Sequence, residues 1–193
     1  MAKTFLTEKF ETAVVYATRL HANQRRKTSG IPYISHLLSV AALVLEAGGS
    51  EEEAIAALLH DAVEDQGGSK TREEILGIFG NEIIAIVDGC TECDTYPKPL
   101  WEERKRQYLE NLLNQTSSSV RRVSLADKLH NARSLLIDWR RYGDTIWSQF
   151  NSSKEKTLWF YKSLVDVYQK TGSDWMTDEF ARTVSELTKE SIK

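Results

Sequence analysis

Apolar residues recur at helical spacing through almost the whole chain, and this pattern constrains the fold more than any other feature. Residues three and four positions apart share one face of an α-helix, so each such segment predicts an amphipathic helix packed on a core. The pattern is clear in Phe10, Ala13, Val14, Ala17 and Leu20. No segment needs a strand to explain its periodicity. The sequence therefore predicts an all-α fold, a single compact bundle of about eight to ten helices.

Short runs of Gly, Pro, Asn and Ser mark the expected helix boundaries. Ser50 and Glu53 have the spacing of a capping box, which predicts the start of a helix that runs into His60. We expect one domain over residues 1–193, with a C-terminal helix over 174–190 packed on it. The expected breaks lie at 28–33, 47–50, 66–69, 96–99 and 114–119, of which 96–99 is interpreted as a mobile crossing over a pocket.

Composition and charge exclude several classes of function. The chain has 193 residues, is 41% hydrophobic and carries a formal net charge of -3, so it has no basic excess of the kind that binds a nucleic-acid backbone. No apolar run is long enough to span a bilayer, and the N-terminus carries charges where a signal peptide is apolar. We therefore expect a cytoplasmic protein without nucleic-acid or membrane partners.

Cys90 and Cys93 have the spacing of a zinc or redox motif. A closed zinc site needs four ligands, and a redox pair usually lies beside a strand and a helix, which this sequence does not predict. We interpret the two cysteines as reduced thiols that are incidental to function.

The segment AALLHDAVEDQGG, residues 56–68, starts as a buried helix and then carries His60, Asp61, Glu64 and Asp65. Such groups are rarely buried without a partner. Helical spacing places His60 and Glu64 one turn apart, and Asp61 and Asp65 likewise. The alternative is a helix end whose charges meet only water.

Three other segments favour a functional site over that alternative. His36 interrupts an apolar helix, and Asp127 does the same in a later helix, with Asn131 one turn beyond it. A cationic stretch over residues 23–30 precedes the His36 helix. Each feature has a structural interpretation when taken alone, as a satisfied core histidine or a solvated basic run. Together they predict one site for a divalent transition metal, because two imidazoles and two carboxylates leave coordination positions open for catalysis: His36, His60, Asp61 and Asp127.

The order H…HD…D resembles that of the HD-domain metal-dependent phosphohydrolases. The likeness is closest to the hydrolase domain of the RelA/SpoT family and to its stand-alone form, the small alarmone hydrolases that include the animal Mesh proteins. It covers about residues 7–168 and rests on four ordered motifs: RRKTSGIPYISH, AALLHDAVEDQGG, ILGIFGNEIIAIVDGCT and SLADKLHNAR.

The resemblance implies an HD-type helical bundle that removes the 3′-pyrophosphate of ppGpp or pppGpp, or of the adenosine equivalents, and releases a 5′-nucleotide and pyrophosphate. It implies one divalent ion, usually manganese, although other transition metals remain open. No synthetase or regulatory domain is expected, and the oligomeric state, including a homodimer, stays open. The alternatives are a phosphatase for another nucleotide such as NADPH, and a non-catalytic nucleotide-sensing HD module.

The resemblance also assigns roles to individual positions. The family's metal ligands match His36, His60, Asp61 and Asp127. Its water-positioning or water-activating pair matches Glu64 and Asp65. Its substrate contacts match the dyad Arg26 and Lys27 for the pyrophosphate, and Asn131 and Ser134 for the sugar and base.

Three positions depart from the family pattern. Leu37 follows the first ligand where proline is common, and Thr28 adds one residue between the dyad and the following Ser-Gly. Glu92 stands where long relatives commonly have a lysine that contacts phosphates. We expect this acidic residue to weaken the grip on the distal 5′ phosphates. Cations in the flanking segment are candidates to compensate: Lys98, Arg104, Lys105 and Arg106.

Overall fold

The computed structural model describes residues 4–92, 97–114 and 117–191, and their regular structure is helical apart from an isolated bridge between Arg25 and Pro32. The prediction of an all-α fold is confirmed. Among the described residues, no helix has the length and apolar character needed to cross a bilayer. The elements are α1 (Glu8–Leu20), α2 (Ile34–Glu46), α3 (Glu51–Leu59), α4 (Ala62–Asp65), α5 (Ser69–Phe79), α6 (Asn81–Cys90), α7 (Trp101–Asn114), α8 (Ser118–Tyr142), the 3-10 helix η1 (Gly143–Gln149), α9 (Lys154–Thr171) and α10 (Trp175–Ser191).

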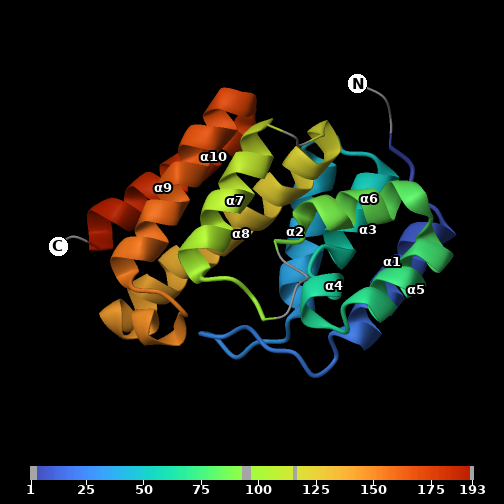
Figure 1. Cartoon of the computed structure of the whole chain (residues 1–193), viewed down its shortest axis with the longest axis horizontal. Coiled ribbons are helices and arrows are strands. Elements are labelled where there is room, and N and C mark those ends of the chain that lie inside the picture. The colour runs from blue at the N-terminus through green and yellow to red at the C-terminus, as the bar shows by residue number, and fades with distance from the viewer. Residues whose placement is uncertain (1–3, 93–96, 115–116, 192–193) are drawn as a thin grey trace.

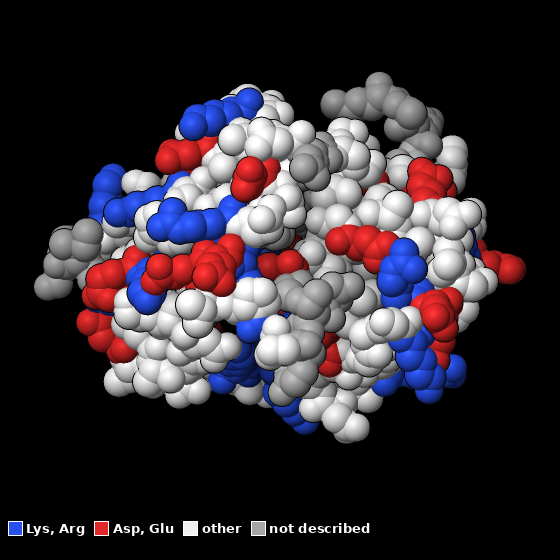
Figure 2. All heavy atoms as spheres, viewed as in Figure 1, with Lys and Arg blue, Asp and Glu red and all other residues white. Residues whose placement is uncertain are grey.

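The long helix α8 lies between two groups of helices. Figure 1 shows α9 and α10 at one end of the molecule and α1 and α5 at the other. Helix α10 packs against α8 and α9, while α3 packs against α1, α2, α6 and α8. On the face drawn in Figure 2, acidic and basic side chains are interspersed.

Helix α3 is enclosed because its sequence is apolar on every side. All residues from Ala54 to Leu59 are buried, and three of them are alanines, which allow the neighbouring helices to approach closely. Its start is fixed by the predicted capping box. Ser50 Oγ accepts from the Glu53 backbone nitrogen at 3.2 Å, and Glu53 Oε2 accepts from the Ser50 nitrogen at 2.8 Å.

The expectation that one helix carries His60, Asp61, Glu64 and Asp65 is wrong. Helix α3 ends at Leu59, and the short α4 begins at Ala62. Asp61 has φ -97° and ψ -2°, so the backbone departs from regular helical geometry between α3 and α4. Adjacent residues of a continuous helix point in different directions, so this break allows His60 and Asp61 to face the same site.

The cationic loop, residues 23–30, is held by its own backbone. The nitrogen of Arg26 donates to the Ile31 oxygen at 2.9 Å, and that of Gly30 donates to the Arg26 oxygen at 2.9 Å. Gly30 has φ 67°, a conformation that side chains disfavour. The loop therefore presents Arg26 and Lys27 from a closed turn next to the start of α2.

Some predicted features lie partly outside the described residues. Of the 96–99 crossing, residues 97–99 are described, and their placement before α7 says nothing of mobility. Cys93 lies outside the described residues, so its interpretation stays untested. Cys90 is a free cysteine, and burial raises the pKa of its thiol, which keeps it protonated.

Candidate functional site

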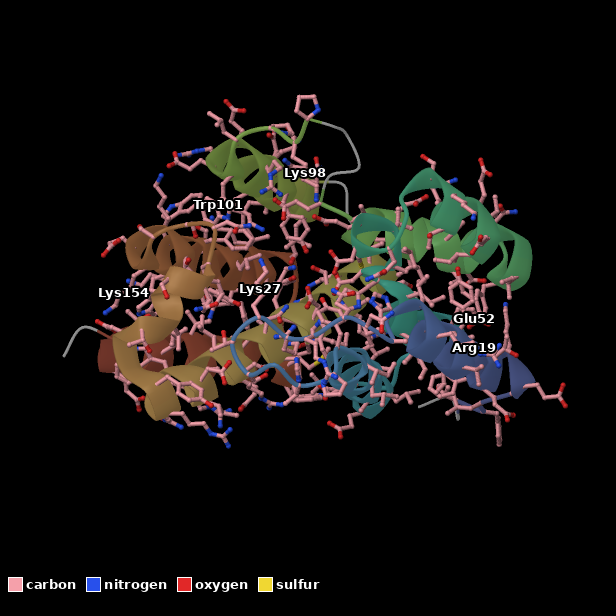
Figure 3. All side chains as sticks on the ribbon, turned by 90° about the horizontal axis from the view of Figure 1, so that it is seen from below. Arg19, Lys27, Glu52, Lys98, Trp101 and Lys154 are labelled. Carbon is pink, nitrogen blue, oxygen red and sulfur yellow. The ribbon has the colours of Figure 1, made fainter. Side chains whose placement is uncertain are left out.

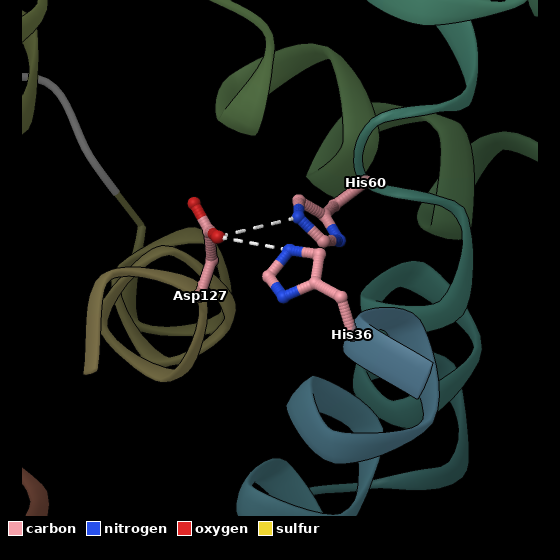
Figure 4. A group of neighbouring side chains, drawn as sticks. All are labelled: His36, His60 and Asp127. Carbon is pink, nitrogen blue, oxygen red and sulfur yellow. Dashed lines mark ion pairs between the residues drawn. The ribbon is translucent and has the colours of Figure 1, made fainter. Parts of the chain in front are cut away.

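Three helical segments bring His36, His60 and Asp127 together (Figure 4). His36 lies on α2, His60 follows α3, and Asp127 lies on α8. Their side chains are buried, with 0%, 3% and 5% of each residue exposed, respectively. One ligand atom from each lies within 4.8 Å of the others. The compact group thus forms at the meeting point of segments that are distant in the sequence.

Asp61, the fourth predicted metal ligand, lies next to both histidines. Its Oδ2 lies 3.0 Å from His60 Nε2 and 3.6 Å from His36 Nε2. Asp127 Oδ1 lies 3.2 Å from His36 Nε2 and 3.6 Å from His60 Nε2. Two carboxylates therefore flank two imidazole nitrogens that face inward.

Hydrogen bonds orient both imidazoles. His60 Nδ1 donates to the Ala57 carbonyl at 2.8 Å, which places the lone pair of the neutral ring on Nε2. His36 Nδ1 lies 2.7 Å from His130 Nδ1, so one of these nitrogens donates to the other. Burial, together with the charge of Arg26, lowers the pKa of His130 to about 4, which keeps His130 neutral and able to accept. His36 then donates from Nδ1 and also presents its Nε2 lone pair to the cluster.

The donor set fits a divalent cation. The Nε2 atoms of His36 and His60 are buried and have no hydrogen-bond partner in the described part of the chain. Burial opposes a charge on His60, but the carboxylates of Asp61 and Asp127 outweigh it and raise its pKa. Without a metal, a proton on the imidazole offsets the negative charge of these carboxylates. A bound cation can offset the same charge. Nitrogen and oxygen donors suit a transition metal.

Asp127 is held on both of its oxygens. Oδ1 accepts from Asn131 Nδ2 at 2.5 Å, and Oδ2 accepts from Lys128 Nζ at 2.7 Å. Burial alone would raise the pKa of Asp127, but the Lys128 charge and the neighbouring imidazoles hold it well below the usual range. Asp127 is therefore ionised, with Oδ1 directed at the histidines.

Glu64 and Asp65 lie beside the cluster and have different partners. Glu64 Oε1 accepts from Lys98 Nζ at 2.8 Å, while Asp65 Oδ2 accepts from Gln24 Nε2 at 2.8 Å. Burial and the charge of Asp61 raise the pKa of Asp65, and a more basic carboxylate is a better proton acceptor. The two carboxylates thus have unequal environments.

A network that the sequence analysis missed orients Asp65 and Asp61. Gln24 Oε1 lies 2.7 Å from His21 Nδ1, which leaves the Gln24 amide nitrogen to donate to Asp65. His21 is buried and stacks on Tyr33 with the ring centroids 5.4 Å apart. The Tyr33 hydroxyl donates to Asp61 Oδ2 at 2.5 Å. Through Tyr33 and Gln24, the buried His21 thereby helps to orient both the predicted metal ligand Asp61 and the water-positioning candidate Asp65.

The cluster opens into a cavity of about 450 Å³, which is in the size range of small-molecule sites. Arg26, Lys27, Asn131 and Ser134 all line it, so the structure brings the four expected substrate contacts to one cavity. Arg26 Nη2 donates to Asn131 Oδ1 at 2.8 Å. The cationic loop is therefore linked to α8 through the same asparagine that contacts Asp127.

The structure corrects the expected role of the flanking cations. Lys98 pairs with Glu64, and Arg106 packs over the Trp159 ring at 5.3 Å. Arg104 and Lys105 line the cavity but pair with Glu92 itself. These cations neutralise the acidic residue or lie elsewhere, and none replaces the expected lysine as an unpaired cation.

The sequence analysis did not identify four residues that contact the site, and the sequence carried a signal for only two of them. His130 stands three residues after Asp127, so helical spacing alone places both on one face. Lys128 follows Asp127 directly, and a buried carboxylate needs a counter-charge. Gln24 and Tyr33 gave no such signal, because their contacts depend on how the loop folds back on α4.

The helical fold and the buried histidine and aspartate cluster define a protein with a metal-type centre inside a helical bundle. The chain belongs to the HD domain family, whose sequence profile matches residues 13–154. HD domains are metal-dependent, and the cluster of His36, His60 and Asp127 is of the kind they require.

Sequence relatives carry hydrolase names. The chain is 42% identical over 125 residues to the Danio rerio guanosine-3′,5′-bis(diphosphate) 3′-pyrophosphohydrolase MESH1, a match that covers 63% of this chain and 66% of the relative. It is 38% identical over 125 residues to a probable enzyme of the same name from Synechocystis, covering 64% of this chain. The chain spans only 16% of the length of that Synechocystis relative.

Solved structures share the fold. One is of a metazoan orthologue of SpoT that is described as hydrolysing ppGpp and acting in starvation responses. It matches with a TM-score of 0.79 and 27% identity, over 96% of this chain and 98% of that one. A Listeria monocytogenes protein matches with a TM-score of 0.69 and 31% identity, over 80% of this chain and 99% of that one. The first of these structural matches thus covers more of this chain than the two 125-residue sequence matches do.

Proposed function

We propose that this protein is a metal-dependent hydrolase that removes the 3′-pyrophosphate from a purine nucleotide phosphorylated at both its 3′ and 5′ positions. The observation that carries the proposal is the pair of buried, unpartnered Nε2 atoms of His36 and His60, flanked by two carboxylates at the inner end of a cavity. The names of the relatives support the substrate: ppGpp or pppGpp, with the adenosine equivalents as outcomes of the test.

His36, His60, Asp61 and Asp127 would hold the ion, for which we propose manganese. A bound divalent cation supplies Lewis acidity, which makes water easier to ionise and offsets charge on phosphate oxygens. The remaining steps fall to this chain's own side chains.

We propose that Asp65 accepts a proton from the attacking water and that Glu64 helps to position that water. Gln24 occupies one oxygen of Asp65 and leaves the other for water, whereas Glu64 is neutralised by Lys98. Arg26 and Lys27 would hold the diphosphate, since cations stabilise charge that builds on phosphate oxygens in the transition state. Asn131 and Ser134 would orient the nucleoside.

We further propose that the protein acts in the cytoplasm on a small-molecule nucleotide, without nucleic-acid or membrane partners. The net charge of -3 supports the absence of a nucleic-acid partner, because the chain has no basic excess to bind a phosphate backbone. A homodimer remains a hypothesis that sedimentation analysis can test.

The function is tested by incubating the manganese-loaded protein with ppGpp, pppGpp, the adenosine equivalents and NADPH, and separating the products by ion-exchange chromatography. The proposal expects pyrophosphate and the 5′-nucleotide from at least one bis-phosphorylated nucleotide. Release of single phosphates, turnover of NADPH alone, or binding without turnover would overturn it in favour of a phosphatase or a sensing module.

A further inference from the structure

Cations line two sides of the cavity in different states. On one side, Arg25, Arg26 and Lys27 of the cationic loop form no ion pair with a carboxylate in the described part of the chain. On the other side, Arg104 and Lys105 of α7 are both paired. Figure 3 shows Lys27 on the loop and Trp101 at the start of α7 on facing sides. The two sides therefore offer a ligand different amounts of unneutralised charge.

One carboxylate neutralises both cations of α7. Glu92 Oε1 lies 3.2 Å from Arg104 Nη1, and Glu92 Oε2 lies 2.5 Å from Lys105 Nζ. No more than 16% of any of the three side chains is exposed, so solvent and salt screen these pairs weakly. We call these residues, with Trp101, the α7 wall.

Neighbouring groups hold the cations of the α7 wall in place. Lys105 Nζ lies 4.6 Å from the centre of the Phe160 ring and 5.8 Å from that of Trp101. Arg104 Nε donates to the Pro99 carbonyl at 3.2 Å. To bind either cation, a ligand phosphate would have to separate it from Glu92. The nearly buried Glu92 carboxylate would then lose an ion-pair partner, which is costly.

We propose that Glu92 is a specificity-determining residue that withdraws the cations of the α7 wall from ligand binding. The site then recognises a nucleotide through the phosphates held at the cationic loop and the metal-type centre. It gains little from additional phosphates that reach the α7 wall. This inference rests on the proposed function, because it concerns the same nucleotide site.

The inference predicts a nucleotide ligand whose 3′ phosphates contribute strongly to the binding free energy through charge, whereas its additional 5′ phosphates contribute little. Nucleotides that differ only in the number of 5′ phosphates should bind with similar affinity. This is measured with guanosine 3′-diphosphates that carry one, two or three phosphates at the 5′ position and in which a methylene replaces the bridging 3′ oxygen, so that they report binding without turnover. Calorimetric titrations use the full chain with manganese in excess of nucleotide.

In the wild type, we expect the Kd to change by less than about threefold from the mono- to the triphosphate, because the α7 wall adds no unpaired cation. In Glu92→Gln, we expect the triphosphate to bind about tenfold more tightly than in the wild type, and the monophosphate to change by less than about threefold. Glu102→Gln is the matched control. Glu102 lies on α7 beside the two cations, pairs with Lys156 outside the cavity, and its substitution changes the net charge equally.

A wild-type protein that binds the triphosphate at least about tenfold more tightly than the monophosphate, with the same ratio in Glu92→Gln, would overturn the inference. So would absence of binding by all three nucleotides. If Glu92→Gln does not fold, Arg104→Gln decides the matter. The inference expects triphosphate binding within about threefold of the wild type, and a loss of about tenfold contradicts it. Pyrophosphate release is measured separately, so a failure of the proposed function remains distinguishable.

Discussion

The inner end of the cavity and its α7 wall hold charge in different ways. At the inner end, His36 and His60 present buried nitrogens that no group of the described chain satisfies. In the α7 wall, every oxygen of Glu92 already has a cation. Buried polar atoms without a partner are costly unless something binds them, whereas the ion pairs of the α7 wall are complete by themselves. Under the proposed function, the inner end carries out the chemistry, whereas the α7 wall offers a ligand no unpaired cation.

The largest effect is expected from the inner end. Asp127→Asn should abolish metal binding and lower turnover by about three orders of magnitude or more, since the variant loses a charged ligand and the cation's stabilisation of the transition state. Metal content by mass spectrometry and kcat provide the measurement. Arg133→Gln, a change on an exposed part of α8, is the control for folding. An Asp127→Asn variant with full metal content and wild-type turnover would break the comparison.

The next effect separates the two carboxylates beside the cluster. Asp65→Asn should lower kcat by about 10²- to 10³-fold with metal retained, because it removes the proposed proton acceptor. Glu64→Gln should lower kcat by about tenfold, since that carboxylate is already paired with Lys98. Steady-state kinetics at saturating manganese checks the order. The reverse order would exchange the two roles, and wild-type kcat in both variants would remove the water-activation assignment.

His130 should affect metal affinity rather than the chemical step. His130→Ala removes the group that faces His36 Nδ1, and the loss of such an orienting partner typically costs about 10- to 100-fold in metal affinity. Competition with a fluorescent chelator measures the change. His130→Gln retains an acceptor and should lose less. Equal affinity in His130→Ala and the wild type would show that His36 needs no orienting partner.

The cationic loop should affect binding and turnover together. Arg26→Ala and Lys27→Ala should each raise KM and lower kcat, by about tenfold in kcat/KM or more, because the loop both positions the substrate and stabilises charge. Initial rates over a range of substrate concentrations separate the two constants. A change in KM alone would reduce the role of the loop to uniform binding.

The smallest effect is expected from the pair of Lys98 with Glu64. Lys98 has 43% of its side chain exposed in its pair with Glu64, and exposed ion pairs contribute little. Lys98→Gln should therefore change kcat/KM by no more than about threefold. A loss as large as that of Arg26→Ala would mean that the charge of Lys98 matters as much as the charges of the cationic loop.

The sequence predicted the inner end well because burial leaves a trace in the pattern. His36 and Asp127 interrupt apolar helices, and titratable groups at such positions need partners. Helical periodicity also predicted the fold class. The break between α3 and α4 left no trace in the sequence, because no glycine or proline marks it.

The outer parts of the site could not be predicted for a physical reason. Glu92 contacts Arg104 and Lys105, 12 and 13 positions further along the chain, and no helical or strand spacing predicts that contact. The Gln24 contact with Asp65 likewise joins groups 41 positions apart. Such contacts depend on the tertiary approach of segments that carry no shared periodicity.

The most direct test of the account is turnover of guanosine 5′-diphosphate 3′-diphosphate in water labelled with oxygen-18, with manganese present and the products analysed by mass spectrometry. If the site directs water to the phosphorus bonded to the 3′ oxygen, that phosphorus–oxygen bond breaks and the label enters the released pyrophosphate. The account predicts one labelled oxygen in pyrophosphate and an unlabelled 5′-nucleotide. Label in the nucleotide, labelled single phosphate, or no turnover with any divalent metal would contradict it.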